Sequence, residues 1–247
     1  MRRNILITGA SSGLGAEMAR QFAASGHNLA LTARRTERLD ALRSELIERY
    51  PQISVVIHSL DVTDHEQVFK VFRAVDGELP LDRIIVNAGL GKGAPLGTGR
   101  FHANRDTALT NFVGALAQVE AALELFRARN AGHLVLIASI SALRGFPKTV
   151  TTYAATKAAL ASIGEGLRLE LMGKPIKVST IYPGYIRSEM NEHVPKAPFM
   201  VDTETGVRAM VAAIEAEKAK AYVPARPWWP LAQVMRVAPL PLLKRMI

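Results

Sequence analysis

Short apolar runs alternate with helical patterns along the chain as far as about residue 224. The apolar runs occupy residues 4–8, 28–32, 54–58, 83–87, 133–137, 177–181 and 221–224. They are apolar throughout and not at every second position, so a strand built from any of them must be buried on both faces. Strands of this kind, joined by helices, form parallel sheets covered on both sides. The alternation therefore predicts an α/β fold, a doubly wound parallel sheet of about seven strands.

The helical patterns predict helices at 16–25, 36–50, 64–75, 106–129, 152–171 and 203–218. Gly26 and Pro51 are suited to end the first two helices, and Thr63 to cap the third. No low-complexity linker precedes the C-terminal segment, which indicates one domain over residues 1–225 and an extension over residues 226–247. An open sheet of this type binds ligands beyond the carboxyl ends of its strands, so the residues that follow the apolar runs are candidates for function.

Composition excludes several kinds of chemistry. The 247-residue chain is 49% hydrophobic and 21% charged, the balance of an ordinary globular protein. It has no cysteine, which excludes disulfides, thiolate catalysis and cysteine-ligated zinc. Its six histidines show no paired spacing typical of ligands, so we expect no metal site. No apolar run is long enough to span a membrane, and the run at 5–7 is too short for a signal peptide, so we expect a cytoplasmic protein.

Positive charge is concentrated near the C-terminus. The formal net charge is +9, and no acidic residue follows Glu217. The basic residues that do follow it are Lys218, Lys220, Arg226, Arg236, Lys244 and Arg245. A basic segment that is also apolar favours a membrane surface or a lipophilic ligand over nucleic acid, and we expect no nucleic-acid partner.

The extension at 226–247 is too apolar for a free terminus. It contains Trp228, Trp229 and several aliphatic residues, and its prolines limit the predicted helix to about 231–238. Several interpretations remain open: packing on its own domain or on a partner subunit, a lid over a lipophilic substrate, or a peripheral membrane contact helped by the basic residues.

A glycine-rich turn joins the first apolar run to the first helical pattern. Its candidate binding residues are Gly9, Ser11, Ser12, Gly13, Leu14 and Gly15. Glycine permits a tight turn and close approach of the backbone to a pyrophosphate, and a helix N-terminus offers free N–H groups and partial positive charge. An ordinary strand-to-helix turn is the alternative. The position after the first strand favours a dinucleotide phosphate site.

Arg34 and Arg35 follow the second apolar run. An acidic residue at this position would bind the adenosine ribose hydroxyls of NAD. Arginine instead forms forked, charge-assisted contacts with a 2′-phosphate. The pair therefore favours NADP(H) as the cofactor, and the alternative is that both residues merely begin a charged helix.

Two further strand ends carry small or polar residues. Asp61 and Val62 follow the third run, and Asn87, Ala88 and Gly89 follow the fourth. By themselves these residues are typical of turns. Their places at the carboxyl ends of strands make the first pair candidates for contact with adenine and the second set candidates for contact with its ribose.

Ser139, Tyr153 and Lys157 form a candidate proton-transfer group. Ser139 follows the fifth apolar run, and Tyr153 and Lys157 lie four residues apart on one predicted helix, so they share a face. A nearby ammonium lowers the pKa of a tyrosine, which is about 10 when free. The phenol can then protonate a carbonyl oxygen as hydride arrives, or deprotonate an alcohol, while the serine hydrogen-bonds the same oxygen. By itself, this spacing is common on helices that carry no chemistry.

In this order along the chain, the motifs resemble those of the short-chain dehydrogenase/reductase family in its single-domain form. The resemblance covers roughly residues 4–225. It rests on Thr8 to Gly15, Asp61-Val62, Asn87-Ala88-Gly89, Asn111, Ser139, Tyr153 with Lys157, and Pro183-Gly184. Each motif is weak alone, whereas the ordered set is specific. The resemblance implies a Rossmann-type fold and a nicotinamide cofactor.

The resemblance also implies a role for each residue. Tyr153 would be the acid/base, Lys157 would hold the nicotinamide ribose and lower the Tyr153 pKa, and Ser139 would orient the substrate carbonyl. Asn111 would hold a water that links Lys157 to solvent. The loop around the nicotinamide carboxamide would comprise Pro183, Gly184, Ile186 and Ser188.

The chain departs from the family pattern at two places. Ser188 stands where the family more often has threonine, which keeps the hydroxyl. The spacing from Ser139 to Tyr153 is one residue longer than usual, and the loop at 144–152 is where the extra residue is expected. Ser141 is the alternative to Ser139, which is preferred because it directly follows the apolar strand.

Together these features predict an NADP(H)-dependent oxidoreductase that reduces a carbonyl group or oxidises the corresponding alcohol. Candidate substrates are lipophilic ketones or aldehydes, steroid-like molecules, or 3-oxoacyl thioesters. The alternative is an NADP(H)-binding sensor or scaffold without turnover. The resemblance implies a homodimer or homotetramer, formed through the long helices at 106–129 and 152–171.

Overall fold

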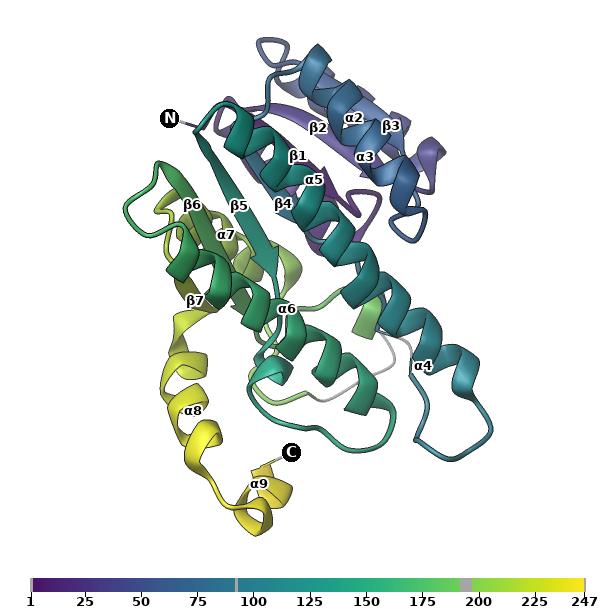
Figure 1. Ribbon diagram of the computed structural model, residues 1–247, viewed down its shortest axis with the longest axis vertical. Coiled ribbons are helices and arrows are strands. Elements are labelled where there is room, and N and C mark those ends of the chain that lie inside the picture. The colour runs from purple at the N-terminus through teal and green to yellow at the C-terminus, as the bar shows by residue number, and fades with distance from the viewer. Residues whose placement is uncertain (1, 92, 192–196, 247) are drawn as a thin grey trace.

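A seven-stranded parallel sheet forms the centre of the computed structural model, which describes residues 2–91, 93–191 and 197–246 (Figure 1). The strands are β1 (Asn4–Thr8), β2 (Asn28–Ala33), β3 (Val55–Ser59), β4 (Arg83–Val86), β5 (Gly132–Ile137), β6 (Ile176–Pro183) and β7 (Lys220–Val223). Their order is β3-β2-β1-β4-β5-β6-β7, and every neighbouring pair is parallel. The predicted doubly wound fold is confirmed, with each strand within two residues of its predicted bounds.

Helices cover both faces of the sheet. They are α1 (Gly13–Ala24), α2 (Thr36–Arg49), α3 (His65–Glu78), α4 (Phe101–Ala108), α5 (Gly114–Ala128), α6 (Thr151–Glu170), α7 (Thr203–Glu215), α8 (Ala225–Val237) and α9 (Leu240–Met246). Adjacent residues of a strand point to opposite faces. Ile5 and Ile7 accordingly pack with α1, α2 and α7, whereas Leu6 packs with α3, α5 and α6.

Three helix starts differ from the sequence prediction. The first helix begins at Gly13 and not at residue 16, because its opening turn is part of the glycine-rich segment. The third is capped by Asp64, whose carboxylate accepts the backbone N–H of Gln67, and not by Thr63. The helix predicted from residue 106 begins at Phe101, after an N-cap, Arg100, that makes no side-chain cap bond. The usual sequence signal for a helix start is therefore missing there.

A π-helical turn, Leu109–Val113, joins α4 to α5 without a break. Such a turn holds one residue more than an α-helical turn and is frequent at functional sites. Asn111 lies within it and is 1% exposed. The π-helical turn therefore contains Asn111, one of the candidate site residues.

The tail forms more helix than its prolines suggested, so the predicted limit of 231–238 is wrong. Regular helix begins after the non-helical residue Arg226, and Pro227 and Pro230 then fall in its first turn. The N–H groups of a first turn have no partner within the helix, so proline costs little there. Pro241 is similarly the second residue of α9. The division into a domain at 1–225 and an extension stays a prediction.

The tail contributes to a third apolar cluster beyond the carboxyl ends of β5 and β6. Its buried tail residues are Trp228, Ala232, Met235 and Leu243. They pack with Ile140 and Phe146, which follow β5, and with Tyr182 of β6. Within the described parts of the chain, no helix has the length and apolarity that crossing a membrane requires.

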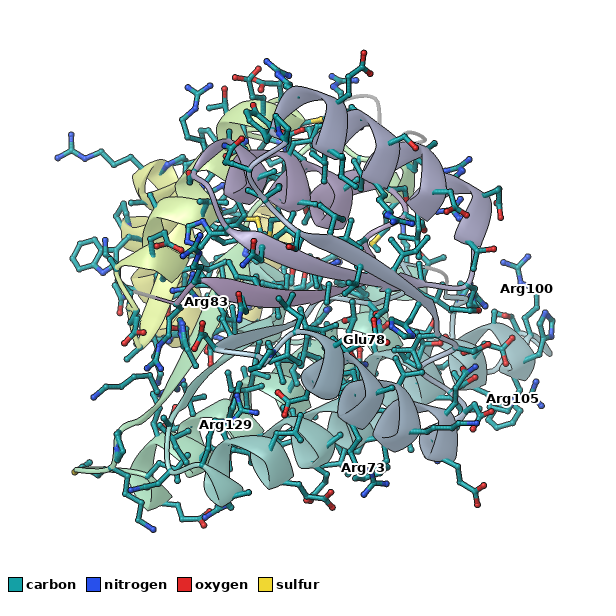
Figure 2. All side chains as sticks on the ribbon, turned by 90° about the horizontal axis from the view of Figure 1, so that it is seen from above. Arg73, Glu78, Arg83, Arg100, Arg105 and Arg129 are labelled. Atoms are coloured by element: carbon teal, nitrogen blue, oxygen red, sulfur yellow. The ribbon has the colours of Figure 1, made fainter. Side chains whose placement is uncertain are left out.

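A buried polar cluster lies at the amino ends of β4 and β5. Arg83, 1% exposed, donates from Nε to His133 Nδ1 at 2.9 Å and also contacts the Glu215 carboxylate. His133 Nε2 lies 2.8 Å from the Ser179 hydroxyl. Burial and the Arg83 charge lower the pKa of His133 to about 3, so this ring stays neutral at ordinary pH. Figure 2 shows Arg83 inside the molecule and Arg100 at its edge.

Candidate active site

One cavity of about 300 Å³ lies at the carboxyl ends of the strands. It collects all but one of the residues predicted to bind or react. They are Gly9, Ser11, Ser12, Gly13, Leu14, Gly15, Arg34, Arg35, Asp61, Val62, Asn87, Ala88, Gly89, Ser139, Tyr153, Lys157, Pro183, Gly184, Ile186 and Ser188. The exception is Asn111, which lies behind the cavity wall. Sheet topology thus brings together residues that the sequence separates by more than a hundred positions.

The glycine-rich turn is built so that the backbone itself forms part of the cavity wall. Gly9 has φ +67°, and a Cβ there would lie 2.8 Å from the Ala88 Cα. A Cβ on Gly15 would lie 2.3 Å from the Gly9 carbonyl oxygen. Ser12, the N-cap of α1, makes no side-chain cap bond. The N–H groups of the first turn therefore face the cavity without a side-chain acceptor from the cap, which suits an anion.

The ends of β1 and β4 are locked to each other, on either side of the point where strand order reverses. The Thr8 hydroxyl accepts the backbone N–H groups of Asn87 at 3.0 Å and of Ala88 at 3.1 Å. The Asn87 amide in turn donates to the Thr8 carbonyl oxygen at 2.9 Å. This amide, predicted to contact ribose, therefore also fixes the two strand ends that frame the cavity.

The arginine pair stands at the rim. Arg35 donates to Ser12 Oγ at 2.8 Å and to Ser11 Oγ at 3.2 Å, which ties it to the glycine-rich turn. Arg34 is two-thirds exposed, with its nearest carboxylate, Asp61, 4.0 Å away. Together they give the rim a positive charge beside the end of β2.

Glu189 is a rim residue that the sequence did not reveal. Its carboxylate lies 2.8 Å from Arg38 of α2 and 3.6 Å from Arg35, and these arginines lower its pKa. The contact joins segments about 150 residues apart, and an exposed glutamate in a loop carries no sequence signal for it. The loop after β6 is therefore tied to the start of α2 across the cavity.

Ser139 and Tyr153 meet at the inner end of the cavity. Ser139 follows β5 and lies beside the Tyr153 phenol, where it opposes the rise in the pKa of that group. Its Oγ also accepts the backbone N–H of Ser141 at 3.1 Å. Ser139 lines the cavity together with Tyr153, whereas Ser141 does not line it. The geometry thus favours Ser139 over Ser141 as the hydroxyl beside a reacting oxygen.

Lys157 lies deeper, 5% exposed, with Nζ 5.9 Å from the centre of the Tyr153 ring. Its ammonium donates to the carbonyl oxygen of Ile137 at 2.7 Å. Burial lowers the pKa of Lys157 to about 8.

The pKa of Tyr153 is raised, mainly by burial, while the Ser139 hydroxyl opposes the rise. The sequence prediction that Lys157 would lower this pKa left out desolvation, which acts on the buried Lys157 and also on the half-buried Tyr153.

Asn111 braces the loop after β4. Its Oδ1 accepts the Leu90 N–H at 2.6 Å, and its Nδ2 donates to the Leu90 carbonyl oxygen at 2.8 Å. A Cβ on Gly89 would lie 3.2 Å from Asn111 Oδ1 and 3.6 Å from Lys157 Nζ, so only a glycine separates these two side chains. The side-chain amide thus helps to shape the floor beside Lys157, and its role in holding water stays a prediction.

Metal binding finds no support in the geometry. Across residues 2–91, 93–191 and 197–246, no three or more His, Asp or Glu side chains gather as a metal site requires. His193 lies outside the described residues.

Comparison with known proteins places this arrangement in a family. The model of the short-chain dehydrogenase family matches residues 3–198. An uncharacterized oxidoreductase of Mycobacterium tuberculosis is 53% identical over 99% of this chain and 97% of its own length.

Two solved structures with similar folds hold a nicotinamide cofactor. A short-chain dehydrogenase from Burkholderia cenocepacia, in complex with NADP, matches 100% of this chain and 98% of its own, with a TM-score of 0.84 at 26% identity. A short-chain dehydrogenase from Sphingobium yanoikuyae, in complex with NADPH, matches 94% of this chain and 92% of its own, with a TM-score of 0.81 at 27% identity. The chain belongs to the short-chain dehydrogenase family of oxidoreductases.

Proposed function

We propose that this oxidoreductase uses NADP(H) to reduce a lipophilic ketone or aldehyde, or to oxidise the corresponding alcohol. One observation carries the proposal. A single cavity has the Ser139–Tyr153 pair beside the buried Lys157 ammonium at one end and the Arg34–Arg35 rim at the other. The first end suits proton transfer to a carbonyl oxygen, and the second suits a phosphorylated nucleotide.

The residues of the cavity fit the cofactor. The glycine-rich backbone and the N-terminus of α1 would hold its pyrophosphate, where a Cβ on Gly9 or Gly15 would collide with the chain. Arg34 and Arg35 would bind its 2′-phosphate. The cofactor complexes of the Burkholderia and Sphingobium relatives support the same choice. When bound, the cofactor supplies or accepts the hydride.

Tyr153 would donate its phenolic proton to the substrate oxygen in reduction, and Ser139 would hold that oxygen by a second hydrogen bond. The raised pKa of Tyr153 keeps the phenol protonated, which is the form that reduction needs. Lys157, placed behind Tyr153 and beside Gly89, would bind the nicotinamide ribose and stabilise the phenolate that remains.

The apolar surroundings of Ser139 support a lipophilic substrate. The third cluster includes Ala138 and Ile140, which lie on either side of this residue in the sequence, and Phe146. Leu90 and Met190 line the cavity itself. Steroid-like molecules and 3-oxoacyl thioesters remain candidates within this class. Homodimeric or homotetrameric assembly and a cytoplasmic location stay predictions.

An NADPH oxidation assay against ketones and aldehydes of increasing chain length tests the proposal. Turnover should rise with chain length, and Tyr153→Phe should lower kcat by about 100- to 10,000-fold, as loss of general acid catalysis does. Undiminished activity in Tyr153→Phe would contradict the mechanism. NADPH binding without turnover of any carbonyl would favour the alternative, a sensor or scaffold.

Arg34→Asp tests the cofactor. The aspartate would repel a 2′-phosphate and accept ribose hydroxyls, so NADPH affinity should fall by about 10- to 100-fold while NADH affinity changes little. Arg43→Asp, on the exposed face of α2, makes the same charge change away from the cavity and should affect neither. Equal losses for both cofactors would exclude a 2′-phosphate contact at Arg34.

A further inference from the structure

Trp228 of α8 lies against the loop after β6. The indole is 2% exposed, and a Cβ on Gly184 would lie 2.0 Å from its Nε1. Gly184 in turn donates its N–H to the Val223 carbonyl oxygen at 2.9 Å, which extends the pairing of β6 with β7. Residue 184 must therefore be glycine because an indole from the tail fills the space beside it.

The same indole orders the residues around that loop. Tyr185 meets it edge to face with ring centres 5.6 Å apart, and Phe199 does so at 6.0 Å. Among the described residues, Nε1 has no hydrogen-bond acceptor although it is buried. An unbonded buried N–H costs about 1–3 kcal/mol. Trp228 thus packs against Gly184 and the two rings even though its buried N–H group lacks a hydrogen bond.

Arg144 holds the other end of α8. Its Nη1 donates to the carbonyl oxygens of Met235 at 2.8 Å, Arg236 at 3.2 Å and Ala238 at 2.9 Å. These belong to the last turn and cap of α8, where carbonyls lack partners within the helix and a positive charge is favourable. Arg144 itself lies five residues after Ser139, in the loop that follows β5.

The two contacts connect α8 to both loops that flank Tyr153. The loop after β5 carries Ser139, and the loop after β6 begins with Gly184, which lines the cavity beside Pro183, the last residue of β6. Strands β5 and β6 end before these loops, and helix α8 contacts both of them.

Resting on the proposed function, we propose that Trp228 and Arg144 are positioning residues that clamp α8 across these loops. The clamp fixes Gly184 and Ser139 relative to Tyr153, so that the nicotinamide side of the cavity and the proton-donating side are held at a fixed distance from each other. Misplacement by about 1 Å can cost a factor of about 100 in rate. Of the interpretations left open for the tail, this proposal favours packing on its own domain, where the tail supports the site.

The chain's two tryptophans allow a direct test. Trp229, 59% exposed, can be replaced in Trp229→Phe, which leaves Trp228 as the only indole. On titration with NADPH under tryptophan excitation, Trp228 emission should be quenched and nicotinamide emission should appear. Calorimetry on the same variant measures binding independently. Absence of calorimetric binding would overturn the proposed function together with the inference, whereas binding with silent Trp228 emission would overturn the inference alone.

A double mutant tests whether Gly184 and Trp228 act as one unit. Gly184→Ala should drive a Cβ into the indole and lower kcat about 100-fold, with a smaller change in NADPH affinity. Adding Trp228→Ala removes the collision and should recover about 10-fold of that loss, a gain that independent sites would not show. Purely additive effects on kcat would contradict the coupling.

Arg144→Met tests the other contact, with Arg226→Met as its control. Both variants remove one positive charge, but Arg226 is exposed at the start of α8. Measured well below the unfolding temperature, Arg144→Met should lower kcat about 10-fold and shift Trp228 emission to the red, while Arg226→Met changes neither. A loss of thermal stability with kcat and emission unchanged would assign Arg144 a purely structural role and overturn the clamp.

Discussion

Two buried cations lie at opposite ends of β5 and differ in the groups that they contact. At the amino end, Arg83 contacts the Glu215 carboxylate, the His133 ring and the Ile214 carbonyl oxygen. At the carboxyl end, Lys157 donates to the neutral carbonyl oxygen of Ile137. A buried charge without a carboxylate partner is costly, so its retention marks a place where chemistry outweighs stability.

The two ends also differ in the pKa of a buried group, His133 at the amino end and Lys157 at the carboxyl end. The pKa of His133 is lowered to about 3, so this ring does not titrate near neutral pH. The pKa of Lys157 is lowered to about 8, so the carboxyl end does. Burial beside the Arg83 charge keeps the His133 ring neutral, whereas burial alone brings the pKa of Lys157 close to neutral pH.

Replacing Lys157 by methionine should have the largest effect on function. Lys157→Met keeps the length of the side chain and removes the charge that stabilises phenolate, so kcat should fall by about 1,000-fold. The free energy of unfolding should not fall, because an unpaired buried charge has been removed. Steady-state kinetics and chemical denaturation measure the two. A stability loss like that of Arg83→Met would abolish the contrast between the two ends.

Arg83→Met should have the opposite profile. It leaves Glu215 without its buried partner, so the free energy of unfolding should fall by about 3 kcal/mol. Turnover by the folded protein should be unchanged, since the amino ends of the strands lie away from the cavity. Arg73→Met, at an exposed position of α3, is the matched control and should change stability little. A fall in kcat at temperatures where Arg83→Met is folded would show that the two ends are coupled.

The smallest of these effects is the pH dependence of binding. Lys157 is charged below its pKa of about 8 and neutral above it. If the ammonium holds the ribose, NADPH affinity should weaken as pH rises through about 8, by at most about tenfold per pH unit. In Lys157→Met this transition should be absent. Calorimetry across that range measures it, and the same transition in both proteins would assign it to another group.

The sheet and the residues at its strand ends were predictable because burial on both faces leaves continuous apolar runs that can be read directly from the sequence. The ordered motifs then brought Ser139, Tyr153 and Lys157 to one cavity. Their pKa values were not predictable, because desolvation depends on how the helix face packs and not on spacing along it. The partner of a charged residue can be predicted from the sequence only when the two residues lie close together along the chain.

Long-range polar contacts account for most of what was missed. Arg83 and His133 were indistinguishable from ordinary polar positions at strand starts, yet they are fully buried together. Glu189 and Arg38 meet across about 150 residues. Arg144 caps the end of α8, a helix predicted over about 231–238, but its contact with that helix was not predicted. Each contact is set by tertiary packing, which overrides local propensity.

The residues that form the cavity wall run from Gly9 to Met190 along the chain and lie on both sides of the reversal in strand order. A molecule bound there contacts only the completely folded chain, since no fragment holds enough of the wall. Binding must then be linked to global unfolding: a ligand at about 100 times its dissociation constant adds about 2.7 kcal/mol to the free energy of unfolding. Protection against heat or proteolysis therefore offers a way to find ligands without an assay for turnover.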